Sequence, residues 1–141
     1  MAGMGRIVRF GVSMDEELLA RFDGLIRALG YANRSEALRD LVRERLVRHE
    51  WEEGEEVVGV IVLLYEHHKR ELSDELIDLQ HHHHDLVIAT MHVHLDADNC
   101  LEILAVRGPG PEVQRLAELL RSLKGVKHGQ LAATSTGRRL R

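Results

Sequence analysis

The 141-residue chain has no long apolar segment and only one cysteine. Its longest apolar run, Val57 to Tyr65, is interrupted by Gly59 and falls far short of the ~20 residues that a membrane-spanning helix requires. The N-terminal sequence MAGMGRIVRF lacks the apolar core of a signal peptide, so we expect a cytoplasmic protein, with Met4 as an alternative first residue. Cys100 cannot form a disulfide within the chain, which fits a reducing compartment and leaves its thiol free for other chemistry.

An excess of positive charge is also missing. The formal net charge is -4, and residues 1–50 hold nine arginines against eight acidic residues. This balance supports nucleic-acid binding only weakly, so a DNA-binding function has to be argued from architecture. Histidine, by contrast, is abundant, because the chain has ten and five of them lie between His81 and His92. That density suggests a metal-binding protein.

Residues 6–14 alternate in the pattern of a short strand, with polar or small residues on one face and apolar residues on the other. The first face carries Arg9, Gly11 and Ser13, and the second carries Phe10, Val12 and Met14. Because one face is apolar, the strand needs a cover.

Two helices are predicted after this strand. Ser13 and Glu16 match a capping box that opens the first helix, and Gly30 ends it. Asn33 and Glu36 match a second box, from which apolar residues at helical spacing continue toward residue 49. A single strand with two helices is too small to pair its backbone groups or to bury two apolar stripes alone. We therefore expect an intertwined dimer with a two-stranded antiparallel ribbon, a width that fits the major groove of DNA.

The acidic stretch 51–56, WEEGEE, is predicted to be a linker between residues 1–50 and a second domain at 57–141. In the second domain the patterns predict a strand at 57–65, a helix at 67–80 and strands at 86–95 and 100–107 joined by a turn at 96–99. Pro109 and Pro111 open another helix, and a last strand lies near 126–133. This order is the βαββαβ arrangement of ferredoxin-like domains, so the fold class is α+β.

A metal site is predicted in the hairpin of this domain. His92 and His94 are two apart in a strand and project from the same face, and Cys100 begins the next strand. The spacing His-x-His-x5-Cys favours a metal site over a buried cysteine beside surface histidines. Three ligands leave a vacancy, for which His81 to His84 are candidates, although a solvated loop or an expression tag would also explain those four residues.

The donor set leaves the metal open. Imidazoles with one thiolate in a plane favour Ni(II) or Cu(II), whereas a tetrahedral arrangement favours Zn(II). Glu102, on the same strand face as Cys100, is either a surface residue or the acceptor for the outer N–H of a ligand histidine.

At this point the chain resembles the nickel-responsive transcriptional regulators. The matching segments are GYANRSEALRD (30–40), YEHHKREL (65–72), QHHHHDL (80–86), MHVHLDADNCLEI (91–103) and GVKHG (125–129). The resemblance implies an N-terminal ribbon-helix-helix domain fused to an ACT-type nickel-binding domain, assembled as a homotetramer, a dimer of dimers. It also implies a repressor of nickel uptake genes that binds palindromic half-sites of duplex DNA with Ni(II) as corepressor, one ion per subunit.

The resemblance further implies individual roles. The square-planar nickel site would use His92, His94 and Cys100 of one subunit with His81 of a neighbour. The base-reading positions would be Arg9, Gly11 and Ser13, and since a glycine has no side chain to read a base, the operator is expected to differ from that of relatives with a hydroxyl residue there. Phosphate contacts would fall to Arg34, Lys69 and Arg70, and a cation site between the domains to Glu36 and Asp40.

Two other functional classes compete with a regulator. A metal-dependent hydrolase would keep an open coordination position for water, which a filled set of four ligands argues against. A metal-storage or chaperone protein would leave the N-terminal strand and helices without a purpose. DNA retention by the nickel-loaded protein would separate the regulator from both alternatives.

Overall fold

The computed structural model describes residues 5–141, apart from the side chain of Arg70, and Met4 lies outside this range. The chain consists of two compact units that divide between Leu46 and Val47, with Arg139–Arg141 belonging to the first unit. Within the described residues no helix is long and apolar enough to cross a membrane.

The first unit contains α1 (Glu16–Ala28) and the beginning of α2 (Arg34–Glu52), preceded by a segment that is neither helix nor strand. The strand predicted at 6–14 is therefore not formed within one chain, because a strand needs a hydrogen-bonding partner and residues 5–15 pair with no other segment of the described chain. Its apolar side chains are open to solvent, with Ile7 88% and Phe10 79% exposed.

The start of α1 differs from the prediction. Asp15, rather than Ser13, is the N-cap, and its Oδ1 accepts hydrogen bonds from the backbone N–H of Glu17 at 3.0 Å and of Leu18 at 3.2 Å. A carboxylate at this position satisfies two free amides and also interacts favourably with the helix dipole. At the start of α2 the prediction is confirmed, because Asn33 Oδ1 accepts from the backbone N–H of Glu36 at 2.9 Å.

Helix α2 continues to Glu52 and so runs into the stretch predicted to be a linker. Trp51 is only 7% exposed, and its Nε1 donates a hydrogen bond of 2.8 Å to the carbonyl of Thr134. Gly59 makes room for the indole, since a Cβ there would lie 3.4 Å from the ring. Residues 51–56 are thus not an extended linker, because burial of the tryptophan holds the end of α2 against the sheet that follows.

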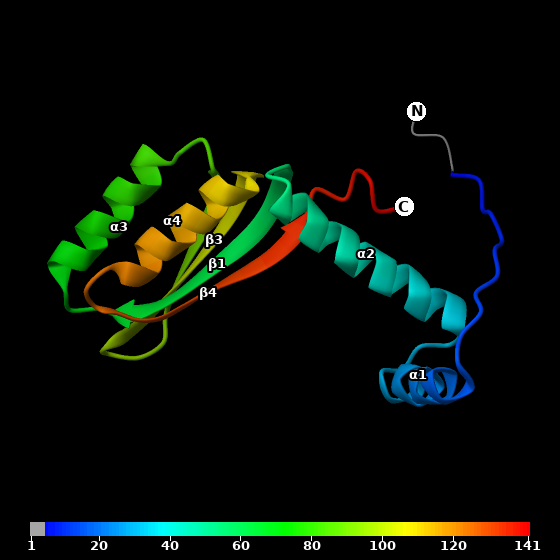
Figure 1. Ribbon diagram of the computed structural model, residues 1–141. Helices are drawn as coiled ribbons and strands as arrows, with labels where there is room; N and C mark the ends of the chain where they lie inside the picture. The colour runs from blue at the N-terminus through cyan, green and yellow to red at the C-terminus, as the bar shows by residue number, and fades with distance from the viewer. Residues whose placement is uncertain (1–4) are drawn as a thin grey trace. The chain divides into compact units, whose positions relative to one another are not determined.

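The second unit contains a four-stranded antiparallel sheet and two helices, as predicted for a ferredoxin-like domain. Along the chain it is formed by β1 (Glu56–Glu66), α3 (Arg70–His82), β2 (Val87–His94), β3 (Asn99–Pro109), α4 (Gly110–Ser122) and β4 (Val126–Ser135). The strand order is β2-β3-β1-β4, and α3 and α4 cover one face of the sheet (Figure 1).

The core of this unit lies between the sheet and its helices. Alternate residues of β1 and β3 are buried there, against Leu72 and Leu76 of α3 and Leu116 and Leu120 of α4. The intervening residues of the central strands are also apolar but only half buried: Val58, Val60, Val62, Leu101 and Ile103. The domain therefore has an apolar open face in a single chain, and this face needs another cover.

Candidate metal centre and nucleic-acid interface

The β2–β3 hairpin positions the histidines and the cysteine of the predicted metal site. Cross-strand pairing sets His92 opposite Glu102 and His94 opposite Cys100, so these four side chains share the helix-facing side of the sheet. The turn is held by Asp96, whose Oδ1 accepts from the backbone N–H groups of residues 98 and 99, both at 2.8 Å. A rigid turn fixes the register on which this arrangement depends.

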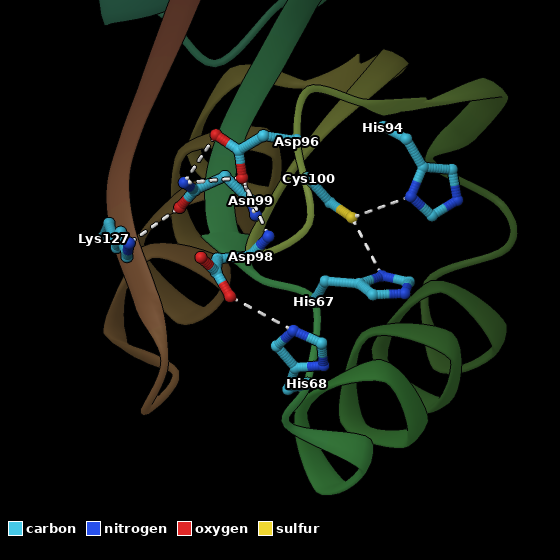
Figure 2. A network of polar contacts seen from close by, with 8 residues as sticks. All are labelled: His67, His68, His94, Asp96, Asp98, Asn99, Cys100 and Lys127. Atoms are coloured by element: carbon cyan, nitrogen blue, oxygen red, sulfur yellow. Dashed lines mark hydrogen bonds and ion pairs between the residues drawn. The ribbon is translucent and has the colours of Figure 1, made fainter.

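Cys100 has no solvent exposure, and its Sγ lies between two imidazoles (Figure 2). The Nδ1 atom of His94 is 3.5 Å from the sulfur, and Nδ1 of His67 is 3.2 Å from it. Together these three residues form the group whose ligand atoms all lie within 4.8 Å of one another.

The sequence reasoning did not single out His67. It follows β1 by one residue, and β1 pairs with β3 so that Tyr65 lies opposite Cys100. That register brings the end of β1 to the start of β3, and only strand pairing across many residues could reveal it. The available signal was the position of His67, two residues beyond a predicted strand.

Burial makes the cysteine a reluctant thiolate. Desolvation, followed by the charges of Glu102 and Asp96, raises the pKa of the Cys100 thiol above its ordinary value. The same burial and the charge of Glu102 raise the pKa of the Tyr65 hydroxyl, which therefore remains protonated. A cation that binds the sulfur must displace its proton.

Glu102 fixes the orientation of His92. Its Oε2 is 2.9 Å from His92 Nδ1, and the hydroxyl oxygen of Tyr65 is 3.0 Å from the same nitrogen. Tyr65 also donates to Glu102 Oε2 over 3.4 Å. When Nδ1 carries the proton and donates to the carboxylate, Nε2 of His92 is the nitrogen available to a metal.

His81 lies far from this cluster within the chain. It sits in the last turn of α3, where His81 and His84 line a pocket of about 220 Å³ with Ile77 and Val87. Helix α3 begins next to the His67 end of β1 and runs away from it (Figure 1). At ~1.5 Å per residue, His81 is separated from that end by roughly 17 Å of helix. The structure therefore brings together His67, His92, His94 and Cys100 but not His81 of the same chain.

The predicted base-reading residues Arg9, Gly11 and Ser13 are all exposed, on the segment that precedes α1. Among the predicted phosphate contacts, Arg34 is held by Asp23 through two hydrogen bonds of 2.8 Å, which tie the start of α2 to α1. Lys69 forms an ion pair with Glu66 at 3.1 Å.

The side chain of Arg70 lies outside the described part of the chain. Of the two residues predicted to hold a cation, Asp40 accepts a hydrogen bond of 2.9 Å from Tyr31 and forms an ion pair of 3.2 Å with Arg43. Glu36 is half buried one helical turn earlier on α2. Both carboxylates therefore belong to the same helix face.

Comparisons with known proteins agree with this arrangement. Residues 8–49 match the model of the ribbon-helix-helix proteins of the copG family, and residues 58–134 match that of the NikR C terminal nickel binding domain. A protein of Geobacter sulfurreducens named as a nickel-responsive regulator is 59% identical over 138 residues, which cover 97% of this chain and 99% of that protein. A protein of Pyrococcus furiosus with the same name is 52% identical over 133 residues, covering 94% of this chain and 96% of the other.

A solved structure gives a more distant likeness. A protein of Thermotoga maritima described as uncharacterized aligns with a TM-score of 0.51 at 11% identity, and the match covers 56% of this chain and 98% of that one. At this identity the likeness concerns the fold alone.

Proposed function

Because the chain belongs to the nickel-responsive regulators, a family of DNA-binding transcription regulators and not of enzymes, we propose that it is a repressor with Ni(II) as its corepressor. In this proposal the ion binds at a site completed by two subunits, and the resulting assembly has the higher affinity for its operator. The separation of His81 from the hairpin histidines is the observation that carries the proposal.

The proposed ligands are His92, His94 and Cys100 of one subunit and His81 of the partner subunit. A metal–nitrogen bond is about 2 Å long, so the roughly 17 Å of α3 between the two groups excludes His81 of the same chain. Three imidazoles and a thiolate in one plane suit Ni(II), with one ion for each subunit. The residues present fit this ion, since Glu102 turns the free nitrogen of His92 away from the carboxylate.

A site of this kind requires assembly, and two apolar surfaces support it. In the first unit, Phe10, Val12 and the other apolar side chains of residues 7–14 are exposed and would become buried if two copies paired as a ribbon. In the second unit the open sheet face is apolar along the central strands. Two interfaces of different kinds lead to a dimer of dimers, the homotetramer.

DNA contact is proposed for the ribbon. Pairing of residues 6–14 in two copies would present Arg9, Gly11 and Ser13 to base edges in the major groove, with one ribbon for each half-site of a palindromic operator. Phosphates are proposed as partners of Arg34, Lys69 and Arg70, and Arg34 would exchange Asp23 for a phosphate on binding.

The remaining elements of the proposal follow from this role. Glu36 and Asp40 are the proposed cation ligands between the domains. A regulator of nickel uptake genes acts in the cytoplasm, where its DNA is. Nickel would act by binding one quaternary arrangement more tightly than the others, since a ligand shifts an equilibrium only by its differential affinity.

The test is His81→Ala, with His82→Ala as its matched control. His82 is the adjacent residue in the same turn, and its Nδ1 lies 2.9 Å from the carbonyl of Asp78. Operator affinity is measured by fluorescence anisotropy at fixed salt, with and without Ni(II), on a duplex from the gene's own upstream region. We expect the His81 variant to keep partial nickel binding through its hairpin and to lose most of the nickel-dependent gain in DNA affinity, which should be several-fold or more in the parent.

Other outcomes have defined meanings. A full nickel effect in the His81 variant would refute the site shared between subunits. Nickel binding by the parent chain without any affinity for the duplex would support a storage or chaperone role instead.

A further inference from the structure

We infer that His67, His94 and Cys100 of one chain form a second metal site, which suits a tetrahedral ion such as Zn(II) and shares two ligands with the proposed nickel set. The donors come from three places in the second unit: the end of β1, the end of β2 and the start of β3. The site itself rests on these contacts, and its competition with nickel rests on the function proposed above.

The donor spacing fits such an ion. With zinc bonds of about 2.3 Å to sulfur and 2.0 Å to nitrogen, a tetrahedral angle sets neighbouring donors roughly 3.5 Å apart. The observed separations from Cys100 Sγ are 3.2 Å to His67 Nδ1 and 3.5 Å to His94 Nδ1. Small rotations of the two rings therefore suffice to coordinate an ion.

The backbone holds these donors together without a metal. The N–H of His67 donates to the carbonyl of Asp98 at 2.7 Å, which fastens the end of β1 to the hairpin turn. Around that contact, His68 Nε2 lies 3.2 Å from Asp98 Oδ1, and Lys127 donates to Asn99 at 2.7 Å (Figure 2). A network outside the ligands thus sets their positions, as expected of a preorganised site.

His92 is not needed for this second site, because its Nδ1 is engaged by Glu102 and Tyr65. Two imidazoles and one thiolate give three protein ligands, and the exposed side chains of His67 and His94 leave the fourth position open to water. Coordination forms two metal–nitrogen bonds and one metal–sulfur bond, and the thiol proton passes to solvent.

Two consequences follow from the shared ligands. Ions at the two sites exclude each other, since His94 and Cys100 cannot serve both. An ion held by His67 needs no residue of another subunit, so it occupies the chain without connecting subunits through His81. Metals that prefer tetrahedral ligation would accordingly bind without the DNA response expected for nickel.

The experiment uses the full-length protein with Co(II) as a spectroscopic reporter and Zn(II) in competition with a chromophoric chelator. The variants are His67→Ala and, to keep a polar side chain, His67→Asn. His68→Ala is the matched control, because His68 is adjacent and also exposed yet contacts Asp98 and not the sulfur. Circular dichroism checks that each variant is folded.

We expect the parent and His68→Ala to show the intense ligand-field bands of four-coordinate Co(II) together with a sulfur-to-cobalt transition. Both His67 variants should lose the four-coordinate bands and bind Zn(II) at least tenfold more weakly, while their Ni(II) affinity changes less than threefold. Retention of the cobalt spectrum and the zinc affinity would overturn the inference. Equal weakening of nickel and zinc would also overturn it, because His67 would then belong to a single common site.

His81→Ala separates this inference from the proposed function. That variant should weaken Ni(II) binding and leave the cobalt spectrum and Zn(II) affinity unchanged. An unaltered nickel affinity in His81→Ala would count against the site shared between subunits and leave the single-chain site standing.

Discussion

Glu102 offers the sharpest test of how the fold prepares the nickel site. Its side chain is almost fully buried, at 8% exposure, and Oε2 lies 2.9 Å from His92 Nδ1. Partners of this kind fix the orientation of a ligand histidine and raise its basicity, and their loss typically reduces metal affinity about 10–100-fold. A tenfold loss corresponds to about 1.4 kcal/mol.

The two substitutions at this position should differ. Glu102→Gln keeps an oxygen that can accept from Nδ1 and removes only the charge, so nickel affinity should fall by roughly tenfold. Glu102→Ala removes the acceptor and leaves Tyr65 without one of its two partners, so the loss should approach about 100-fold. The expected order of affinity is parent, then glutamine, then alanine.

The assay is competition for Ni(II) against a chelator of known affinity, with thermal unfolding of the apo protein measured in parallel. Glu66→Gln is the control: it removes a carboxylate from the end of β1 that pairs with Lys69. This control should bind nickel as the parent does. Nickel affinity that stays within twofold of the parent in Glu102→Ala would refute the idea that the carboxylate orients His92.

Two further predictions concern the thiol and the ribbon. Because burial raises the pKa of Cys100, the thiol is protonated at neutral pH, so nickel affinity should rise about tenfold per pH unit between roughly 7 and 8.5, a slope that Cys100→Ala should lose with its sulfur-to-nickel absorption. Lower pH, toward about 6.5, should weaken binding further as histidines protonate. Arg9→Ala should cost roughly 1–3 kcal/mol of operator affinity and relax the preference at one base of each half-site, measured with a panel of duplexes; uniform weakening would instead indicate a phosphate contact.

The linear pattern of residues was sufficient for most of the second domain. Strand and helix periodicities predicted its elements in the order observed, and the turn at 96–99 was expected from its polar sequence. Local chemistry was enough here, because alternation, caps and turns depend on residues a few positions apart. The hairpin spacing of His92, His94 and Cys100 was readable for the same reason.

Local patterns were less reliable where two residue types could do the same work. Ser13 and Asp15 are both good N-caps, and the choice of Asp15 depended on which residue's backbone entered the helix. Trp51 stands in an acidic stretch that resembles a linker, yet its ring finds the carbonyl of Thr134, 83 positions away. No local pattern reports such a partner.

The composition of the metal cluster was decided by tertiary structure. His67 comes near Cys100 only because β1 and β3 pair in a register that sets Tyr65 opposite the cysteine, which brings together residues 33 positions apart. Tertiary structure also separates His81 from the hairpin by the length of α3, although the two are close in sequence. Sequence by itself determined which donors exist and which face of a strand they share; strand pairing decided which of them meet, because that depends on long-range backbone hydrogen bonds that no short window contains.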